Sequence, residues 1–140
     1  MPAGRATNSS GSHVDYSLAR RAVLIAYRSG QVSRLEICDA HPDLLRAARN
    51  FGEHTSSRCP VCEAGRLVLV SYVFSDELPK RENGKVWPRG DLAPLLKFRE
   101  VRLYTVEVCP ECSWNHVRSQ VAVGHGRGRR ASRRGRRAST

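Results

Sequence analysis

The sequence predicts an α+β fold, in which two N-terminal helices are followed by a three-stranded antiparallel sheet. Three observations support this prediction. Apolar residues recur at helical spacing between positions 15 and 52, two runs rich in β-branched side chains occupy residues 67–74 and 101–108, and a C-P-x-C motif flanks each of these runs.

Two helices are expected before the first of those runs. Asp15 is a suitable cap for the first helix, and Gly30 provides a stop. Its core face is predicted to consist of Leu18, Ala22, Ile25 and Ala26, with the solvent side marked by Arg20, Arg21 and Arg28. Residues 32–38 are predicted to be extended.

The second helix is indicated by its start and stop signals. Asp39 or His41 is expected to cap it, Pro42 suits the first turn because its missing N–H is not needed there, and Gly52 ends it. Its predicted apolar face consists of Leu44, Leu45, Ala48 and Phe51.

The predicted sheet follows. Residues 67–74 (LVLVSYVF) and 101–108 (VRLYTVEV) are typical of strands, and residues 115–123 are predicted to form a third strand that turns back at the second cysteine pair. The polar stretch 76–90 contains turn signals and is predicted to be a loop, with a short helix at residues 91–97.

Length and hydropathy limit the classes of protein. A chain of 140 residues accommodates one small domain, predicted at residues 14–123, and is too short for a multidomain enzyme. The longest apolar run has six residues, 22–27, against the roughly 20 that span a bilayer, so no membrane partner is expected. Residues 1–13 lack the apolar core of a secretory signal and are predicted to be disordered. A cytoplasmic protein with reduced cysteines is therefore expected.

The positive charge is concentrated at the C-terminus. The chain has 24 Lys and Arg against 13 Asp and Glu, a formal net charge of +11. Residues 124–140 contain seven arginines and no acid, which leaves a net charge of +4 for residues 1–123. This tail is predicted to be disordered and to bind nucleic acid through Arg127, Arg129, Arg130, Arg133, Arg134, Arg136 and Arg137. The alternative is a tail that only maintains solubility.

The two C-P-x-C motifs carry the clearest chemical signal. Each C-x-x-C spacing lets two thiolates converge on one metal ion, and four thiolates suit structural Zn²⁺. The predicted zinc ligands are Cys59, Cys62, Cys109 and Cys112. Because each pair lies next to a predicted strand, the sheet is expected to be zinc-ribbon-like. The 46 residues between the pairs add about 1 kcal/mol of loop-closure cost, against the ten or so kcal/mol that a structural zinc ion contributes.

Other chemistry for the cysteines has weaker support. A redox dithiol needs one pair at the start of a helix rather than two pairs beside strands, while iron is compatible with the same four-sulfur cage. A zinc deaminase requires H-x-E with P-C-x-x-C, and none of the five histidines precedes a Glu in that way. Cys38 and His116 are candidate substitute ligands. The alternative for Cys38 is a small buried hydrophobe, and the alternative for His116 is a residue that lies beside the ligands or on the surface. Asp76 and Glu77 are interpreted as a solvated turn.

Aromatic and basic residues also gather around the second cysteine pair. Residues 98–99, 102–104 and 114–118 could stack bases and contact phosphates, or the aromatic side chains could simply cover the core. In the tail, R-R-A-S occurs twice, which makes Ser132 and Ser139 candidate kinase sites.

Several motifs together resemble an uncharacterised family of short actinobacterial proteins, a domain of unknown function, over about residues 14–123. The resemblance rests on Val14-Asp15-Tyr16, RRAVL at 20–24, Cys38-Asp39-Ala40 with Pro42, LLRAA at 44–48, C-P-V-C, Asp76-Glu77-Leu78, and 104–109 followed by Cys112 and Trp114-Asn115-His116. It implies a cytoplasmic, metal-binding protein and supplies no activity or catalytic residue.

The sequence thus predicts a non-enzymatic, zinc-ribbon-like adaptor that binds nucleic acid or a nucleoprotein machine such as the ribosome or RNA polymerase. No catalytic residues are predicted. The alternatives are a structural or protein-interaction zinc module without a nucleic-acid role, with a protein partner on the sheet, and a thiol redox protein.

Overall fold

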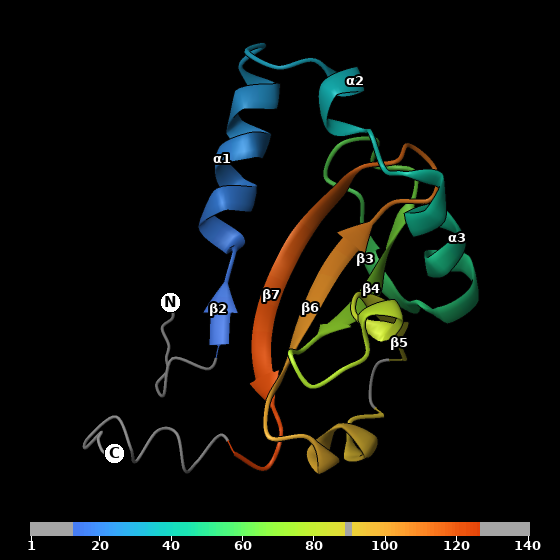
Figure 1. Cartoon of the computed structure of the whole chain (residues 1–140). Helices are drawn as coiled ribbons and strands as arrows, with labels where there is room; N and C mark the ends of the chain where they lie inside the picture. The colour runs from blue at the N-terminus through green and yellow to red at the C-terminus, as the bar shows by residue number, and fades with distance from the viewer. Residues whose placement is uncertain (1–12, 89–90, 127–140) are drawn as a thin grey trace.

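The computed structural model describes residues 13–88 and 91–126 of the chain. The helices and strands follow the order β2 (His13–Asp15), α1 (Ser17–Arg28), α2 (Arg34–Ile37), α3 (Pro42–Phe51), β3 (Glu53–Arg58), β4 (Arg66–Phe74), η1 (Lys80–Glu82), β5 (Lys85–Trp87), η2 (Ala93–Lys97), β6 (Val101–Val108) and β7 (Asn115–Val123). Figure 1 shows the helices arranged around one strongly twisted sheet. Within the described residues, no helix is long and apolar enough to cross a membrane.

Over residues 13–88 and 91–126, the sheet has six antiparallel strands rather than the predicted three. Its order is β2-β7-β6-β4-β3, and β5 pairs with the same strand, β4, as β3 does. The three predicted strands are present as β4, β6 and β7. Neighbouring residues along β4 and β6 are in continuous register, with Tyr72 opposite Tyr104. The sheet is therefore larger than that of a minimal zinc ribbon.

The additional strands lack the features that predict strands from sequence. Strand β3 reads EHTSSR and has no large apolar residue, while β2 and β5 contain three residues each. All three pair along the outer edges of the apolar strands. Their conformation thus depends on backbone hydrogen bonds to a neighbour, which hydrophobic periodicity does not report.

Helices α1 and α3 cover opposite faces of this sheet. Successive residues of a strand point to opposite faces, and Glu107 and Val108 are successive residues of β6. Glu107 contacts Arg20 of α1, whereas Val108 packs in a cluster with Ala47 and Ala48 of α3. Figure 1 shows α1 beside β7 and α3 on the other side of the sheet.

The predicted buried face of α1 was wrong. Leu18 and Ile25 are exposed, whereas Leu24 is buried and Arg20 points towards the sheet. The helix is rotated in this way because Arg20 pairs with the buried carboxylate of Glu107. Tyr16 is the N-cap of α1, and Asp15 lies one residue before it. The Asp15 carboxylate still accepts a hydrogen bond from the backbone N–H of Ser17, the first residue of the helix.

Side-chain caps determine where the next two helices begin. Residues 34–37 form one turn of helix rather than the predicted extended segment, because Ser33 and Glu36 form a reciprocal capping box. Helix α3 begins as expected, with the His41 side chain accepting from the N–H of Asp43, and it ends at Gly52.

The opposite end of the sheet has its own small core. Leu95 of η2 packs with Val73, Val101 and Leu103, in the segment where a short helix was expected. Beyond β7, the N–H groups of His125 and Gly126 donate to the carbonyls of Phe98 and Arg99. The seven tail arginines and both R-R-A-S motifs lie outside the described residues.

Candidate metal centre

The two cysteine pairs occupy the same end of the sheet. Cys59 and Cys62 lie in the turn between β3 and β4, and Cys109 and Cys112 lie in the turn between β6 and β7. Because β4 and β6 are paired neighbours, the two turns are adjacent. The 46-residue insert that separates the pairs in sequence contains β4 near its start and β6 at its end, and the pairing of these two strands brings the cysteine turns together.

The two turns are built alike. In each, the first cysteine's carbonyl accepts from the residue four positions later, at 3.1 Å for Glu63 and 2.9 Å for Ser113. These two residues both have a positive φ, 60° and 75°. The N–H of the first cysteine closes each turn, by bonding to the carbonyl of Gly65 or of Trp114. The repeated geometry gives both cysteine pairs the same local backbone arrangement.

All four sulfurs converge. The Sγ atoms of Cys59, Cys62, Cys109 and Cys112 lie within 4.8 Å of one another. The contacts between the turns are 3.7 Å for Cys59–Cys112 and 3.7 Å for Cys62–Cys109. The first cysteine of each pair is buried and the second is half-buried, and none forms a disulfide. This cluster can hold a metal ion.

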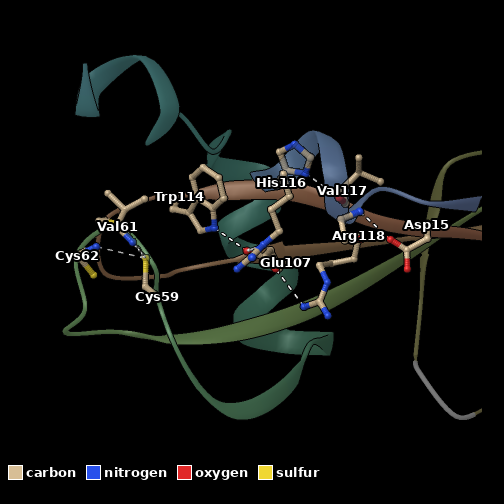
Figure 2. A network of polar contacts seen from close by, with 12 residues as sticks. Asp15, Cys59, Val61, Cys62, Glu107, Trp114, His116, Val117 and Arg118 are labelled. Atoms are coloured by element: carbon tan, nitrogen blue, oxygen red, sulfur yellow. Dashed lines mark hydrogen bonds and ion pairs between the residues drawn. The ribbon is translucent and has the colours of Figure 1, made fainter. Parts of the chain in front are cut away.

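Backbone N–H groups point at the sulfurs of the first turn. Val61 and Cys62 donate to the Sγ of Cys59 at 3.3 and 3.5 Å, and Gly65 donates to the Sγ of Cys62 at 3.4 Å. Figure 2 shows Val61 and Cys62 beside Cys59 at the end of the sheet. Such donors stabilise negative charge on sulfur, as bound thiolates require.

The thiols have different pKa values for identifiable reasons. Burial opposes the thiolate at Cys62, but hydrogen bonds from the N–H groups of Gly65 and Ala64 outweigh it and lower the pKa of Cys62 to about 7. Burial raises the pKa of Cys109 to about 11 and also raises the pKa of Cys112. The second turn therefore holds neutral thiols at neutral pH unless a cation displaces their protons.

Gly65 allows the two turns to approach each other. A Cβ atom at this position would lie 2.5 Å from the Sγ of Cys109 and 2.8 Å from the Cγ of Glu111. No side chain other than hydrogen fits there without moving the second turn. Sequence reasoning missed this residue, although a glycine three positions after a C-x-x-C is a detectable signal.

A buried polar network lies next to the cluster. Trp114 is buried against Cys59 and Leu24, and its indole N–H donates to Glu107. Arg20 and Arg118 pair with the same carboxylate, at 2.9 and 3.1 Å. Figure 2 shows the Trp114 and Arg118 contacts converging on Glu107. The network joins the second turn to α1 and to β7.

The other candidate residues have distinct positions. The Sγ of Cys38 lies 3.6 Å from that of Cys112, although Cys38 is outside the group of four converging sulfurs. His116 is also outside that group, with its ring stacked on Trp114 at a centroid distance of 6.0 Å. Asp76 and Glu77 lie in an exposed turn, as interpreted, and the Glu77 carboxylate also accepts from the N–H groups of Arg99 and Glu100.

Trp114 and Tyr104, two aromatic side chains around the second turn, pack against other parts of the protein. Trp114 is fully buried, which removes it from any base-stacking surface. Tyr104 is half-buried and packs edge-on against Phe74, while Arg102 is exposed.

Comparison with known proteins places the chain in a family. Residues 8–138 match the model of a family of unknown function (DUF5318). The chain belongs to this family. Similar proteins include the uncharacterised protein Rv0049 of Mycobacterium tuberculosis and the uncharacterised protein Mb0050 of Mycobacterium bovis. Each is 37% identical over 120 residues, which cover 86% of this chain and 88% of the relative. No solved structure matches the chain.

The comparisons confirm the resemblance that the motifs indicated, and they extend it. The matched range includes most of the arginine-rich tail, which the motifs alone placed outside the family. The mycobacterial relatives agree with an uncharacterised actinobacterial family.

Proposed function

We propose that this protein is a non-enzymatic, zinc-ribbon-like adaptor whose fold depends on one structural zinc ion. The observation that carries the proposal is the convergence of four cysteine sulfurs. Sulfurs bound to zinc at 2.3 Å in tetrahedral geometry lie about 3.8 Å apart. The 3.7 Å contacts between the two turns fit that geometry.

The donor set favours a structural role over catalysis. Four thiolates complete a tetrahedral shell, whereas catalytic zinc keeps one position for water and usually has histidine or carboxylate ligands. A centre with four thiolates carries a charge of about −2, which the N–H groups of the first turn offset. The zinc ion thus ties the two hairpins together.

The outward face of α1 suggests how an adaptor would contact a protein. Leu18 and Ile25 are 78% and 56% exposed, and Ala22 lies between them at helical spacing. Exposed Arg21 and Arg28 flank this stripe, and the sequence of α1 contains no acid. A second copy of α1 would bring like charges together, so the proposed occupant is an acidic, amphipathic segment of another protein.

A synthetic peptide can test this docking face. The probe is a helical peptide with leucines on one face and glutamates beside them, and its control carries lysines instead. We expect the zinc-loaded protein to prefer the acidic peptide, and the double variant Leu18→Ser/Ile25→Ser to weaken that binding by about tenfold or more. Leu96→Ser removes an exposed leucine of η2 and should have no effect. Equal binding of both peptides contradicts an acidic partner. If the protein forms a dimer that Ile25→Ser dissociates, the occupant of this face is a second copy of the chain.

The arginine-rich tail supports a second candidate function, the binding of nucleic acid or a nucleoprotein machine. Seven arginines without an acid in residues 124–140 would contact phosphates. If all seven do so on a duplex, the log–log salt slope is roughly −6. The salt dependence of RNA and DNA binding should be compared between the full chain and a chain that ends at Gly126, because the N–H of Gly126 still donates to the carbonyl of Arg99. If the full chain and the truncated chain bind RNA and DNA equally well, the tail does not have this role.

A further inference from the structure

A fifth thiol lies beside the four that converge. The S–H of Cys38 points at the Sγ of Cys112, at 3.6 Å. Cys38 is at the C-terminal cap of α2, 21 residues before the first C-P-x-C motif. With four thiolates already sufficient for the metal, Cys38 is a surplus thiol in contact with one ligand.

The structure holds this thiol next to Cys112 by contacts that do not involve a metal. The N–H of Ala40 donates to the carbonyl of Ser113 at 3.0 Å, and the Asn115 side chain donates to the carboxylate of Asp39 at 3.0 Å. These bonds join residues 39–40, which follow Cys38, to residues 113–115, which follow Cys112. One backbone bond and one side-chain bond thus hold the two sulfurs close together.

Packing alone does not account for Cys38. The residue is half-buried rather than enclosed, and it is in contact with a sulfur as well as with the apolar cluster of the cysteine turns. A disulfide has an S–S length of about 2.05 Å, so closing the observed gap requires a movement of about 1.5 Å.

We propose that Cys38 and Cys112 form a thiol oxidation site that a hydroperoxide converts into a disulfide. The expected release of zinc rests on the proposed zinc centre, whereas the formation of the Cys38–Cys112 disulfide does not. When the disulfide forms, Cys112 leaves the metal, which retains three thiolates. The centre would then release zinc and loosen the joint between the two hairpins.

The reaction balances with the peroxide as the oxidant. The Cys38 sulfur attacks the O–O bond, so that Cys38 becomes a sulfenic acid and an alcohol leaves, or water when the oxidant is hydrogen peroxide. The Cys112 thiolate then attacks the Cys38 sulfur, the S–S bond forms, and the departing hydroxide takes a proton from solvent. Two thiol sulfurs lose two electrons in total, and the two oxygens of the peroxide bond gain them.

The test uses the full, zinc-loaded chain and hydrogen peroxide. Non-reducing peptide mapping by mass spectrometry identifies which cysteines are joined, and a colorimetric chelator follows zinc release. We expect a Cys38–Cys112 disulfide as the first product, and we expect Cys38→Ser to bind zinc normally but to release it about tenfold more slowly. The variant Cys38→Ala repeats the comparison without a hydroxyl group.

Two outcomes would overturn the proposal. One is a first disulfide within a C-P-x-C pair, and the other is an unchanged rate of zinc release in both Cys38 variants. If the chain holds no metal, the proposed zinc centre fails, but peptide mapping of the reduced protein still decides whether Cys38 and Cys112 react first. Failure of the oxidation site and failure of the zinc centre are thus distinguished.

Discussion

The indole Nε1 of Trp114 donates a 2.7 Å hydrogen bond to the carboxylate of Glu107, and both side chains are fully buried. Trp114 follows Cys112 by two residues, so this bond fixes the chain just after the last proposed ligand. The same carboxylate pairs with Arg20 of α1. The network therefore couples the orientation of α1 to the cysteine cluster.

The ion pair between Arg20 and Glu107 should contribute to stability. Arg20→Met leaves the fully buried carboxylate with one arginine and one indole, and we expect it to lower the free energy of unfolding by about 2–4 kcal/mol. Arg21→Met removes the same charge from the exposed side of α1 and should cost less than about 0.5 kcal/mol. Guanidinium titrations of the two zinc-loaded variants provide the measurement. Equal losses would mean that the pair is unimportant.

Replacing Trp114 with Phe should reveal the value of its hydrogen bond. The substitution keeps most of the apolar contact with Cys59 but leaves Glu107 without one buried donor, at an expected cost of about 1–3 kcal/mol plus the lost ring volume. Trp87→Phe is the control, because Trp87 is half-buried and its indole N–H donates to the backbone carbonyl of the exposed residue Asp91. Thermal unfolding followed by circular dichroism compares the two, and a larger loss for the control would contradict the role of the network.

Much of this architecture was predictable from sequence, and the exceptions have physical causes. Strands β4, β6 and β7 and the pairing of the cysteine motifs followed from β-branched runs and from C-x-x-C spacing. The face of α1 did not, because apolar periodicity cannot report that a distant Glu107 draws Arg20 inwards. Likewise, the polar strand β3 depends on pairing with β4, and Cys38 reaches Cys112 only through the folded chain.

A methyl group at Gly65 should weaken metal binding. Gly65→Ala places a Cβ against the Sγ of Cys109, so the second turn must shift and the sulfur cluster must expand. We expect zinc affinity, measured by competition with a chromophoric chelator, to fall by about tenfold or more. Gly30→Ala is a suitable control, since a Cβ there meets no atom within 4 Å although its φ is +84°. That control should lose some stability through backbone strain but retain its metal affinity, and identical zinc affinities for both variants would rule out the close contact as a determinant.

Acid should weaken the contribution of Glu77. The N–H groups of Arg99 and Glu100 donate to its carboxylate and lower the pKa of Glu77 in the folded state. Its stabilising effect is therefore present above the unfolded pKa of about 4.3 and is lost as the pH falls through the lower folded value. Glu77→Gln should be less stable than the native chain at pH 7, and the difference should shrink below about pH 4. Asp76→Asn removes the adjacent charge as a matched control, and a pH-independent difference for Glu77→Gln would argue against this assignment.

The central claim is that four cysteines from two hairpins share one zinc ion, and native mass spectrometry of the purified chain tests it most directly. We predict one zinc ion per chain, lost on mutation of Cys59 or Cys109 to Ser, together with loss of the folded circular dichroism spectrum on chelation. A chain that is fully folded without metal, or one that retains zinc when either cysteine pair is removed, would contradict the account.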